Sequence, residues 1–364
     1  MSIKPERYFQ QKLLRWHHDE NRRELPWKGE KDVYRIWLSE IILQQTRAGQ
    51  GWAYYERFVA AYPTVQQLAA APQESVYKLW EGLGYYTRCK NLHATARRIV
   101  AGHEGRFPAS YEGLLALPGI GPYTAAAIAS FGFGLPHAVV DGNVYRVLSR
   151  FFGEETPVDS TAGKKRFAQL AAACLATDAP AAYNQAIMDF GATVCTPDQP
   201  RCTTCPLRRK CRALATGQVS RLPVKEKQTR QRDRWFVYYI LQHRRQFAVQ
   251  QRTAADVWQQ LWEFPQKELT AAAWQELQQH RDPLRSSPLP ISRARLLGRT
   301  KTVTQQLSHQ TIHAFALLLQ LPGRPSRSAG WTWLDAAKLQ ELAFPRLIHR
   351  LFTPETRELF QRNA

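Results

Sequence analysis

The chain has 364 residues, of which 44% are hydrophobic and 22% are charged. This length is more typical of two domains than of one, and the composition can build hydrophobic cores, which excludes an intrinsically disordered protein. Lys and Arg number 50 against 30 Asp and Glu, and the resulting formal charge of +20 indicates a polyanionic partner such as nucleic acid or an anionic surface.

The first part of the chain has the apolar spacing of helices from Pro5 to about Gly217. Short breaks that carry Gly or Pro separate these helical stretches, as at Leu117-Pro118-Gly119. We therefore expect a mostly α-helical domain over residues 1–217. The clearest helical stretches are Tyr34–Tyr55, Tyr123–Phe131 and Phe167–Ala176.

One acidic residue in an early helical stretch has apolar neighbours. Glu40 follows Ile36 and Trp37 by four and three residues and precedes Leu43 by three, so it shares a helix face with three apolar side chains. A carboxylate in such a place is either capped by a partner or kept protonated by the loss of water. Protonation by desolvation raises the pKa and suits a general acid.

Two glycines, Gly119 and Gly121, stand just before the helical stretch that contains Tyr123. The N–H groups of such a turn can bind an anion at the N-terminus of a helix, but the same turn can also simply join two helices. Twenty residues after Gly121, Asp141 opens another amphipathic stretch. It is either the N-cap of that helix or a positioned catalytic carboxylate.

Four of the six cysteines lie within seventeen residues, with the spacing C-x6-C-x2-C-x5-C. Zinc ribbons usually carry two C-x2-C knuckles, whereas four thiolates in one compact loop suit an iron–sulfur cluster. We therefore favour a [4Fe–4S] cluster over zinc and over four unconnected structural cysteines. The four expected ligands are Cys195, Cys202, Cys205 and Cys211.

Residues 218–234 are polar and basic and form the expected linker, which crosses or approaches the polyanion. After this linker, strand and helix patterns alternate, which predicts a smaller α+β domain over residues 235–364. Residues rich in β-branched and aromatic side chains predict strands at Trp235–Leu241, Gln246–Gln250 and Thr311–Leu321. Helical patterns occur at Thr270–His280 and Leu334–Leu342.

The segments LPGIGPYTA and VVDGNVYR, together with the cysteine spacing, resemble the iron–sulfur branch of the helix-hairpin-helix DNA glycosylases, which includes endonuclease III and MutY. The resemblance covers about residues 5–215. The motif W-L-S-E that ends at Glu40, with Gln44, Gln45 and Thr46 after it, is similar to that of the MutY adenine glycosylases. The resemblance implies that Glu40 is the catalytic acid and Asp141 the second catalytic carboxylate. It also implies that Asn143 orients Asp141 or the attacking water.

Relatives that also cut the DNA strand carry a Lys at the position of Tyr123, and its amine forms a Schiff base with the sugar. Tyrosine cannot do so, and the resemblance therefore implies a monofunctional glycosylase with water as the nucleophile and Tyr123 near the leaving base. The segment G-L-G-Y-Y also resembles MutY and implies that Tyr85 wedges into the base stack, whereas ordinary packing is the alternative. In this family Gln45 would fill the gap left by the extruded adenine, and Gln44 and Thr46 would position the strand.

The second domain resembles a Nudix hydrolase in outline. Its helical segments lack the dense Glu residues that a working pyrophosphohydrolase needs for Mg²⁺, so we do not expect hydrolysis of that kind. Leu307-Ser308-His309 is similar to the F-S-H segment that contacts oxidised guanine in relatives, with Leu in place of Phe. Ser308 and His309 are therefore expected to contact 8-oxoguanine, although His309 could also be an ordinary strand-end histidine.

These features predict a base-excision-repair enzyme that hydrolyses the N-glycosidic bond of adenine opposite 8-oxoguanine or guanine in double-stranded DNA, leaving an abasic site. The alternatives are a pyrimidine-directed glycosylase like endonuclease III and a non-catalytic DNA-binding protein. No apolar stretch reaches the roughly 18 residues of a membrane span, and the polar start is unlike a signal peptide. We expect a monomer without membrane contact, in the cytoplasm and associated with the nucleoid in a bacterium.

Overall fold

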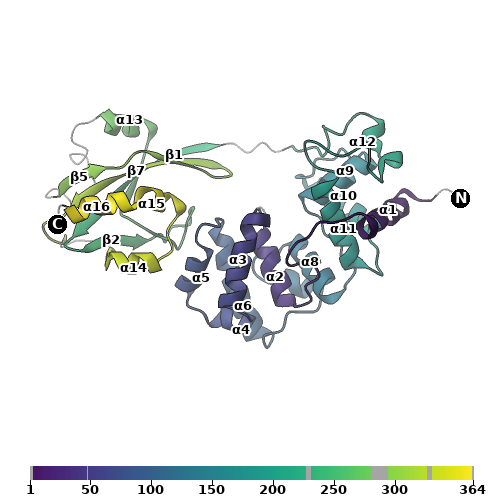
Figure 1. Cartoon of the computed structure of the whole chain (residues 1–364), viewed down its shortest axis with the longest axis horizontal. Helices are drawn as coiled ribbons and strands as arrows, with labels where there is room; N and C mark the ends of the chain where they lie inside the picture. Colours follow the sequence, from purple (N-terminus) through teal and green to yellow (C-terminus); the bar gives the residue numbers. More distant parts are fainter. Residues whose placement is uncertain (1–2, 47, 227–230, 280–293, 326–329, 363–364) are drawn as a thin grey trace. The chain divides into compact units, whose positions relative to one another are not determined.

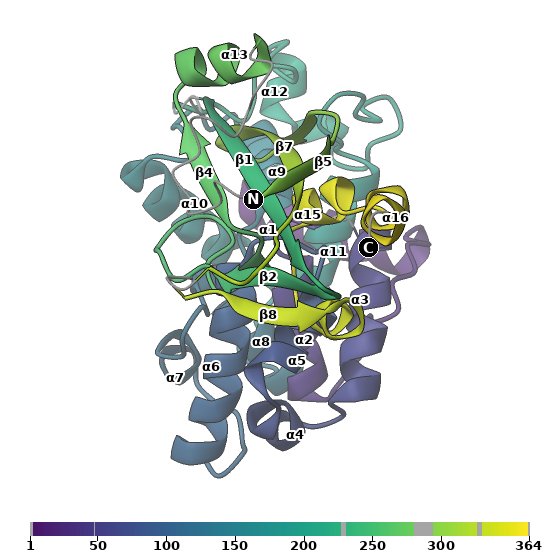
Figure 2. The same cartoon turned by 90° about the vertical axis from the view of Figure 1, so that its left-hand side faces the viewer.

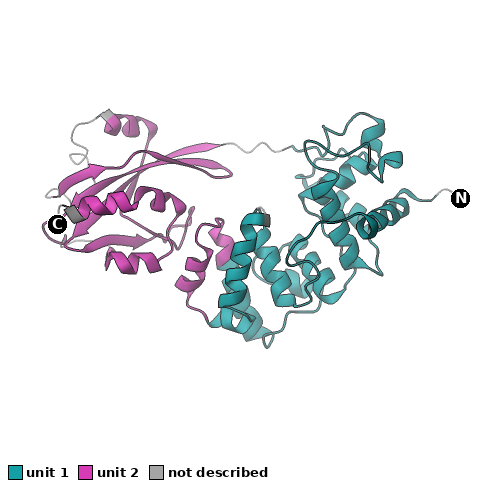
Figure 3. Cartoon of the chain, viewed as in Figure 1, with its two compact units in different colours: residues 1–70, 90–228 teal, residues 71–89, 229–364 magenta. Residues whose placement is uncertain are grey.

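The computed structural model describes residues 3–46, 48–226, 231–279, 294–325 and 330–362 (Figure 1). The chain forms two compact units, coloured separately in Figure 3. The first unit comprises residues 1–70 and 90–228, and the second comprises residues 71–89 and 229–364. The second unit therefore contains a short segment of the predicted helical domain as well as the C-terminal part of the chain. None of the described helices is long and apolar enough to cross a membrane.

The first unit is helical, as its sequence predicts. Its main core gathers side chains of the first helix and of the four helices after the hairpin, for example Phe9, Val147, Phe167 and Phe190. The helices are α1 (Pro5–Asp19), α2 (Val33–Leu43), α3 (Ala48–Ala61), α4 (Val65–Ala70), α6 (Tyr86–Gly102, whose first turn belongs to the second unit), α7 (Tyr111–Leu115), α8 (Pro122–Phe133), α9 (Gly142–Phe152), α10 (Thr161–Cys174), α11 (Pro180–Thr193), the 3-10 turn η1 (Arg208–Lys210) and α12 (Arg212–Ala215).

The prediction of unbroken helix over Tyr34–Tyr55 is wrong. Helix α2 ends at Leu43, and Gln45 adopts a left-handed backbone conformation with a φ of 54°. A residue with positive φ cannot continue a right-handed helix, so the chain turns before α3 begins. The apolar spacing continues through this turn, which is why periodicity alone does not reveal it.

The hairpin between α7 and α8 depends on a glycine. Gly119 has a φ of +72°, and a Cβ added there would lie 2.6 Å from the Cβ of Asn91, so both backbone conformation and space exclude other residues. Gly121 is the N-cap of α8, and Pro122 occupies its first turn, where a missing N–H costs nothing. This turn sets the direction in which α8 leaves the hairpin.

The second unit is built on an eight-stranded mixed sheet with the order β3-β2-β1-β7-β5, to which β4 adds on β1, β6 on β7 and β8 on β2 (Figure 2). The central pair β1 and β7 is parallel, and the remaining pairs are antiparallel. The strands are β1 (Arg232–His243), β2 (Gln246–Gln251), β3 (Trp262–Glu263), β4 (Gln266–Leu269), β5 (Arg295–Arg299), β6 (Val303–Gln306), β7 (Gln310–Gln320) and β8 (Thr332–Asp335). The helices are α5 (Gln73–Trp80), α13 (Ala271–Gln279), α14 (Ala336–Glu341), α15 (Arg346–Leu351) and α16 (Pro354–Arg362).

Both faces of the central strand β1 are covered. Val237, Tyr239 and Leu241 pack with Trp274 of α13 on one face, while the alternate residues Phe236, Tyr238 and Ile240 are also buried. The three predicted strands therefore occur where the sequence places them. The predicted helix over Leu334–Leu342 is wrong at its start, because Leu334 lies in β8 and Asp335 caps α14.

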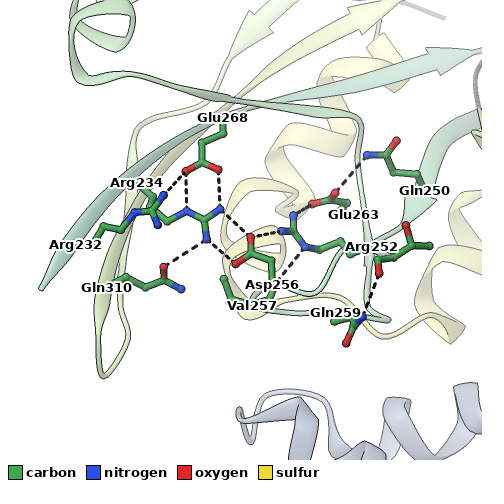
Figure 4. Close-up of polar contacts among 11 residues, drawn as sticks. Arg232, Arg234, Gln250, Arg252, Asp256, Val257, Gln259, Glu263, Glu268 and Gln310 are labelled. Atoms are coloured by element: carbon green, nitrogen blue, oxygen red, sulfur yellow. Dashed lines mark hydrogen bonds and ion pairs between the residues drawn. The ribbon is translucent and has the colours of Figure 1, made fainter. Parts of the chain in front are cut away.

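The end of the predicted linker is also corrected by the structure, since β1 begins at Arg232. Arg234 is only 6% exposed and pairs with Asp256 and Glu268 at N–O distances of 2.6 to 2.8 Å (Figure 4). It is therefore committed to an internal ion-pair network and not to a DNA backbone. Residues 227–230 and His280, which the predicted linker and helix include, lie outside the described residues.

The network continues to a second buried guanidinium. Arg252 bonds Glu263 at 2.6 Å and Asp256 at 3.1 Å, so Asp256 joins the two arginines (Figure 4). This ion-pair network joins β1, β4 and the chain before β3. Removing one member would leave a buried charge without compensation, which typically costs about 3–5 kcal/mol.

Candidate active site

Helix α2 places Glu40 in the interior of the first unit. Asp32 caps this helix by accepting a hydrogen bond from the Tyr34 N–H, and the buried side chains of Ile36 and Trp37 hold the adjacent turn. Glu40 is only 9% exposed. Burial, opposed by a hydrogen bond with Tyr123 and helped by the negative charge of Asp141, raises the pKa of Glu40 from 4.5 to about 7. The side chain can therefore carry a proton near neutral pH.

Tyr123, in the first turn of α8, lies beside Glu40. Its hydroxyl is hydrogen-bonded to the Glu40 carboxyl group and lies 3.5 Å from the Sδ of Met188 in α11. Burial raises the pKa of Tyr123 well above its ordinary value, so the phenol stays neutral. Thr124, the next residue of α8, accepts a hydrogen bond of 3.0 Å from the Nε2 of Gln44. The end of α2 is thus tied to the start of α8.

Asp141 is the N-cap of α9. One carboxylate oxygen accepts the Val144 N–H at 2.7 Å, and the other accepts Nδ2 of Asn143 at 2.9 Å. Burial raises the pKa of Asp141, and these hydrogen bonds, with the charge of Arg146, oppose the rise. Capping and a catalytic role do not exclude each other here, because the cap fixes the position of the carboxylate.

A hydrogen-bonded chain runs from Asp141 to the cysteine loop. Asn143, which donates to Asp141, accepts a 2.8 Å bond from Arg146, and Arg146 also donates to the carbonyl oxygens of Gly191 (2.6 Å) and Cys195 (2.7 Å). Arg146 was not predicted from the sequence, although it stands in the same V-V-D-G-N-V-Y-R segment. Met188 was also missed, and no local signal marks it.

The four clustered cysteines interact with one another. Burial, together with nearby Cys195, Cys211 and Cys202, raises the pKa of Cys205 to about 12, so four thiolates here would need positive metal centres between them. The buried Arg150 of α9 donates to the Cys195 Sγ at 3.6 Å and to the carbonyl oxygens of Thr196 and Pro197. Four mutually interacting thiols beside a fixed cation fit a thiolate-bound iron–sulfur cluster in their chemistry. Among the described residues, no group of three or more His, Cys, Asp or Glu side chains is arranged to hold a single metal ion.

Tyr85 belongs to the second unit and stands out from its loop. It is 48% exposed and has a φ of 52°, a conformation that is uncommon for a residue with a bulky side chain. The buried guanidinium of Arg88 lies 5.7 Å from the Tyr85 ring and 5.0 Å from the Trp80 ring. The loop therefore presents an aromatic ring from a supported backbone. Gln45, in the first unit, is likewise exposed with a positive φ.

Ser308 and His309 form the tip of the turn between β6 and β7, and both are exposed. The Ser308 Oγ and His309 Nδ1 lie 3.2 Å apart. The turn is held by the Leu307 N–H, which donates to the Gln310 carbonyl at 2.8 Å, and by the Gln231 side chain, which donates to the Ser308 carbonyl at 3.3 Å. Two polar side chains are thus presented on a fixed backbone.

Comparison with family models matches both parts of the chain. Residues 38–171 match the HhH-GPD superfamily of base excision DNA repair proteins, and residues 236–353 match the NUDIX domain. The matches include the segments of Glu40, Tyr123 and Asp141 in the first case, and of Ser308 and His309 in the second.

Three similar proteins are described as adenine DNA glycosylases. The chain is 35% identical to the adenine DNA glycosylase of Buchnera aphidicola subsp. Baizongia pistaciae over 71% of this chain and 73% of that protein. It is 29% identical to the adenine DNA glycosylase of B. aphidicola subsp. Acyrthosiphon pisum over 97% of this chain and 99% of that protein. The mouse adenine DNA glycosylase is 41% identical over 59% of this chain and 44% of its own length.

Solved structures show the same helical fold. A thermostable thymine-DNA glycosylase aligns with a TM-score of 0.55 and 29% identity, covering 58% of this chain and 98% of that structure. A trapped endonuclease III–DNA covalent intermediate aligns with a TM-score of 0.52 and 21% identity over 60% of this chain and 99% of that structure, which supports the fold alone.

Proposed function

The chain belongs to the adenine DNA glycosylase family of base excision repair, and we propose that it removes adenine opposite 8-oxoguanine or guanine, with Glu40 as the acid. As a member of this family it is an N-glycosylase that acts on damaged duplex DNA. The observation that carries the mechanism is the pair of carboxyl groups. Burial raises the pKa of Glu40 to about 7; it also raises the pKa of Asp141, but hydrogen bonds and the charge of Arg146 oppose that rise and favour the ionised form.

In the proposed reaction the adenine is first extruded from the duplex. Glu40 transfers its proton to a ring nitrogen of the adenine, and the bond between the base and the sugar C1′ breaks with its electron pair going to the base. The ionised Asp141 stabilises the positive charge that develops on the sugar, and a water then attacks C1′ and releases a proton. Two carboxyl groups in opposite protonation states divide the work as they do in glycosidases.

Tyr123 supports a reaction without a Schiff base. A neutral phenol beside Glu40 can donate and accept hydrogen bonds, but it has no amine to attack the sugar. Asn143 fixes the second carboxylate oxygen of Asp141 by its 2.9 Å hydrogen bond. The product is therefore an intact strand with an abasic site.

Recognition of the base opposite adenine is assigned to the second unit and to the end of α2. The exposed ring of Tyr85 suits insertion into the base stack beside the opposite base. Ser308 and His309 supply the polar contacts to 8-oxoguanine, and each good polar contact is worth about 1–3 kcal/mol of discrimination. Gln44, Gln45 and Thr46 contact the DNA strand and the gap left by the adenine, while Gly119 and Gly121 bring hairpin N–H groups to a phosphate.

Cys195, Cys202, Cys205 and Cys211 would hold a [4Fe–4S] cluster, which would fix the loop that carries them. Arg146 and Arg150 join this loop to α9 through its carbonyl oxygens. Helix α9, which Asp141 caps, is thereby anchored at its middle. Basic side chains stand around the four cysteines in the sequence and would direct the loop towards DNA phosphates: Arg201, Arg208, Arg209, Lys210 and Arg212.

The test uses labelled duplexes that contain 8-oxoguanine·adenine, guanine·adenine, guanine·thymine or an oxidised pyrimidine, incubated with the protein and then with or without alkali. We expect strand breaks at adenine only, and only after alkali. Breaks at the pyrimidines would indicate the endonuclease III-like alternative, breaks without alkali would indicate lyase chemistry, and binding without any break would indicate a non-catalytic protein.

A further inference from the structure

Residues 71–89 are part of the second unit, although the chain immediately before and after them belongs to the first. This segment contains α5 and the loop that presents Tyr85. Among the described residues, five polar contacts join it to the C-terminal part of the unit or support that junction. Three of them involve the carboxylate of Glu81, and one lies apart from it, between the Gln73 Nε2 and the Gln260 Oε1 at 3.4 Å.

Glu81, the C-cap of α5, makes most of these contacts. One carboxylate oxygen accepts the Phe344 N–H at 2.8 Å and lies 2.8 Å from the His349 Nε2. The other oxygen accepts a 2.8 Å bond from Lys78, which also donates to the Leu342 carbonyl at 2.9 Å. Burial would raise the pKa of Glu81, but the bonds from His349, Lys78 and Phe344 lower it, so the carboxylate is ionised at neutral pH.

Hydrogen bonds also support the loop that connects Glu81 to Tyr85. The Trp80 indole N–H donates to the Gly84 carbonyl at 2.9 Å, and the Arg88 N–H donates to the Tyr85 carbonyl at 2.8 Å. The Gly82 N–H bonds the Tyr86 hydroxyl at 3.1 Å. Because these bonds cross the loop between α5 and α6, a displacement of Glu81 would also displace the exposed ring.

Helix α15, which contacts Glu81 through His349, also contacts the strand before the turn that carries Ser308 and His309. His349 lies in α15, and the next residue, Arg350, donates to the Thr304 carbonyl of β6 at 2.7 Å. Strand β6 ends at Gln306, directly before the turn. A short helix therefore contacts Glu81 at one residue and the strand of the 8-oxoguanine turn at the next.

We propose that Glu81 is a positioning residue that, through α15, makes the Tyr85 loop and the Ser308–His309 turn move as one body. This proposal rests on the proposed function, since it assumes that both the Tyr85 loop and the Ser308–His309 turn contact the base opposite adenine. A mispair whose 8-oxoguanine binds Ser308 and His309 would thereby also position the Tyr85 ring in the base stack. The preference for 8-oxoguanine over guanine would then exceed what the turn or the ring gives alone.

The experiment measures single-turnover excision by the full-length protein on 8-oxoguanine·adenine and guanine·adenine duplexes. The variants are Glu81→Gln, His349→Gln and their combination, and Glu74→Gln is the control because Glu74 is an exposed glutamate in the same helix. We expect each of the first two variants to lower the ratio of the two rates on the order of tenfold, a usual size for coupling between sites. The combination should cost no more than the larger single effect, and the control should keep the wild-type ratio.

Placing Glu81→Gln in a Tyr85→Ala background separates coupling from simple destabilisation. If Glu81 acts through the wedge, the substitution should no longer change the ratio once the ring is absent. A wild-type ratio in Glu81→Gln, an equal loss of both rates, or a full additional effect in the Tyr85→Ala background would overturn the proposal. If Tyr85→Ala and His309→Ala alone leave the ratio unchanged, the assignment of recognition to these two elements has failed instead.

Discussion

Replacing Glu40 by Gln should stabilise the folded protein in a way that depends on pH. The native pKa of Glu40 is raised from 4.5 to about 7 by burial, so the folded state holds a proton that the unfolded chain has released between these values. The contribution of Glu40 to the free energy of unfolding of the wild type therefore falls as pH rises from about 4.5 to 7. Above that range it changes little. Gln has a similar size and never ionises, so it avoids this loss.

The size follows from the two pKa values, since a tenfold difference in acid dissociation constant between the folded and unfolded states corresponds to about 1.4 kcal/mol. At pH 5 the ionisation of Glu40 in the unfolded chain costs the folded state roughly 0.8 kcal/mol, and at pH 8 the cost is about 3.3 kcal/mol. The free energy of unfolding of Glu40→Gln relative to wild type should therefore rise by about 2.5 kcal/mol from pH 5 to pH 8. Any fixed cost of burying the amide cancels in this comparison.

The assay is urea unfolding of both proteins at the two pH values, followed by a signal from the first unit. Glu56→Gln is a matched control, since Glu56 is an exposed residue of α3 in the same unit, and it should show no such pH dependence. An equal stability difference at pH 5 and pH 8 would show that Glu40 has an ordinary pKa. That result would remove the physical basis of its role as the acid.

Three further outcomes are expected. Cys202→Ser should lose iron and visible absorbance and fold poorly, because three thiolates leave the cluster site open; normal iron content would refute this assignment. Gly191→Ala should displace Asn143, because the new Cβ would lie 2.6 Å from the Cβ of Asn143, and Asn143 holds Asp141 by a hydrogen bond. Misplacing a catalytic group in this way should slow excision at least about tenfold. Gly102→Ala, where a Cβ meets no atom within 4 Å, is its control. Truncation after Gly217 should leave excision from guanine·adenine and remove most of the preference for 8-oxoguanine; an unchanged preference would place recognition in the remaining residues.

The sequence predicts the helical first part, three strands of the sheet and the surroundings of Glu40 because each depends on local spacing. Three apolar neighbours on one helix face are sufficient to indicate a buried carboxylate. The end of α2 could not be predicted in the same way. Its apolar pattern continues through the break, and no local spacing marks the left-handed conformation of Gln45 that separates α2 from α3.

Contacts between distant segments are the main features that the sequence does not reveal. Met188 reaches Tyr123 from a helix 65 residues later in the chain, and Glu81 meets His349 across 268 residues. Arg234 looks like part of a basic linker, yet it is buried against Asp256 and Glu268. The sequence around a charged residue near the start of a strand does not indicate which acidic residues will pair with it in the fold.

The dependence of adenine excision on pH tests the central assignment most directly. Single-turnover rates on the 8-oxoguanine·adenine duplex, measured from pH 5 to pH 9, should fall above a pKa of about 7 in the wild type, because Glu40 must be protonated to act. Glu40→Gln should be at least about a hundredfold slower at pH 6, in keeping with the usual contribution of general acid catalysis, and should lack this decrease. A Glu40→Gln rate within a few-fold of wild type, or an unchanged decrease near pH 7 in that variant, would contradict the assignment.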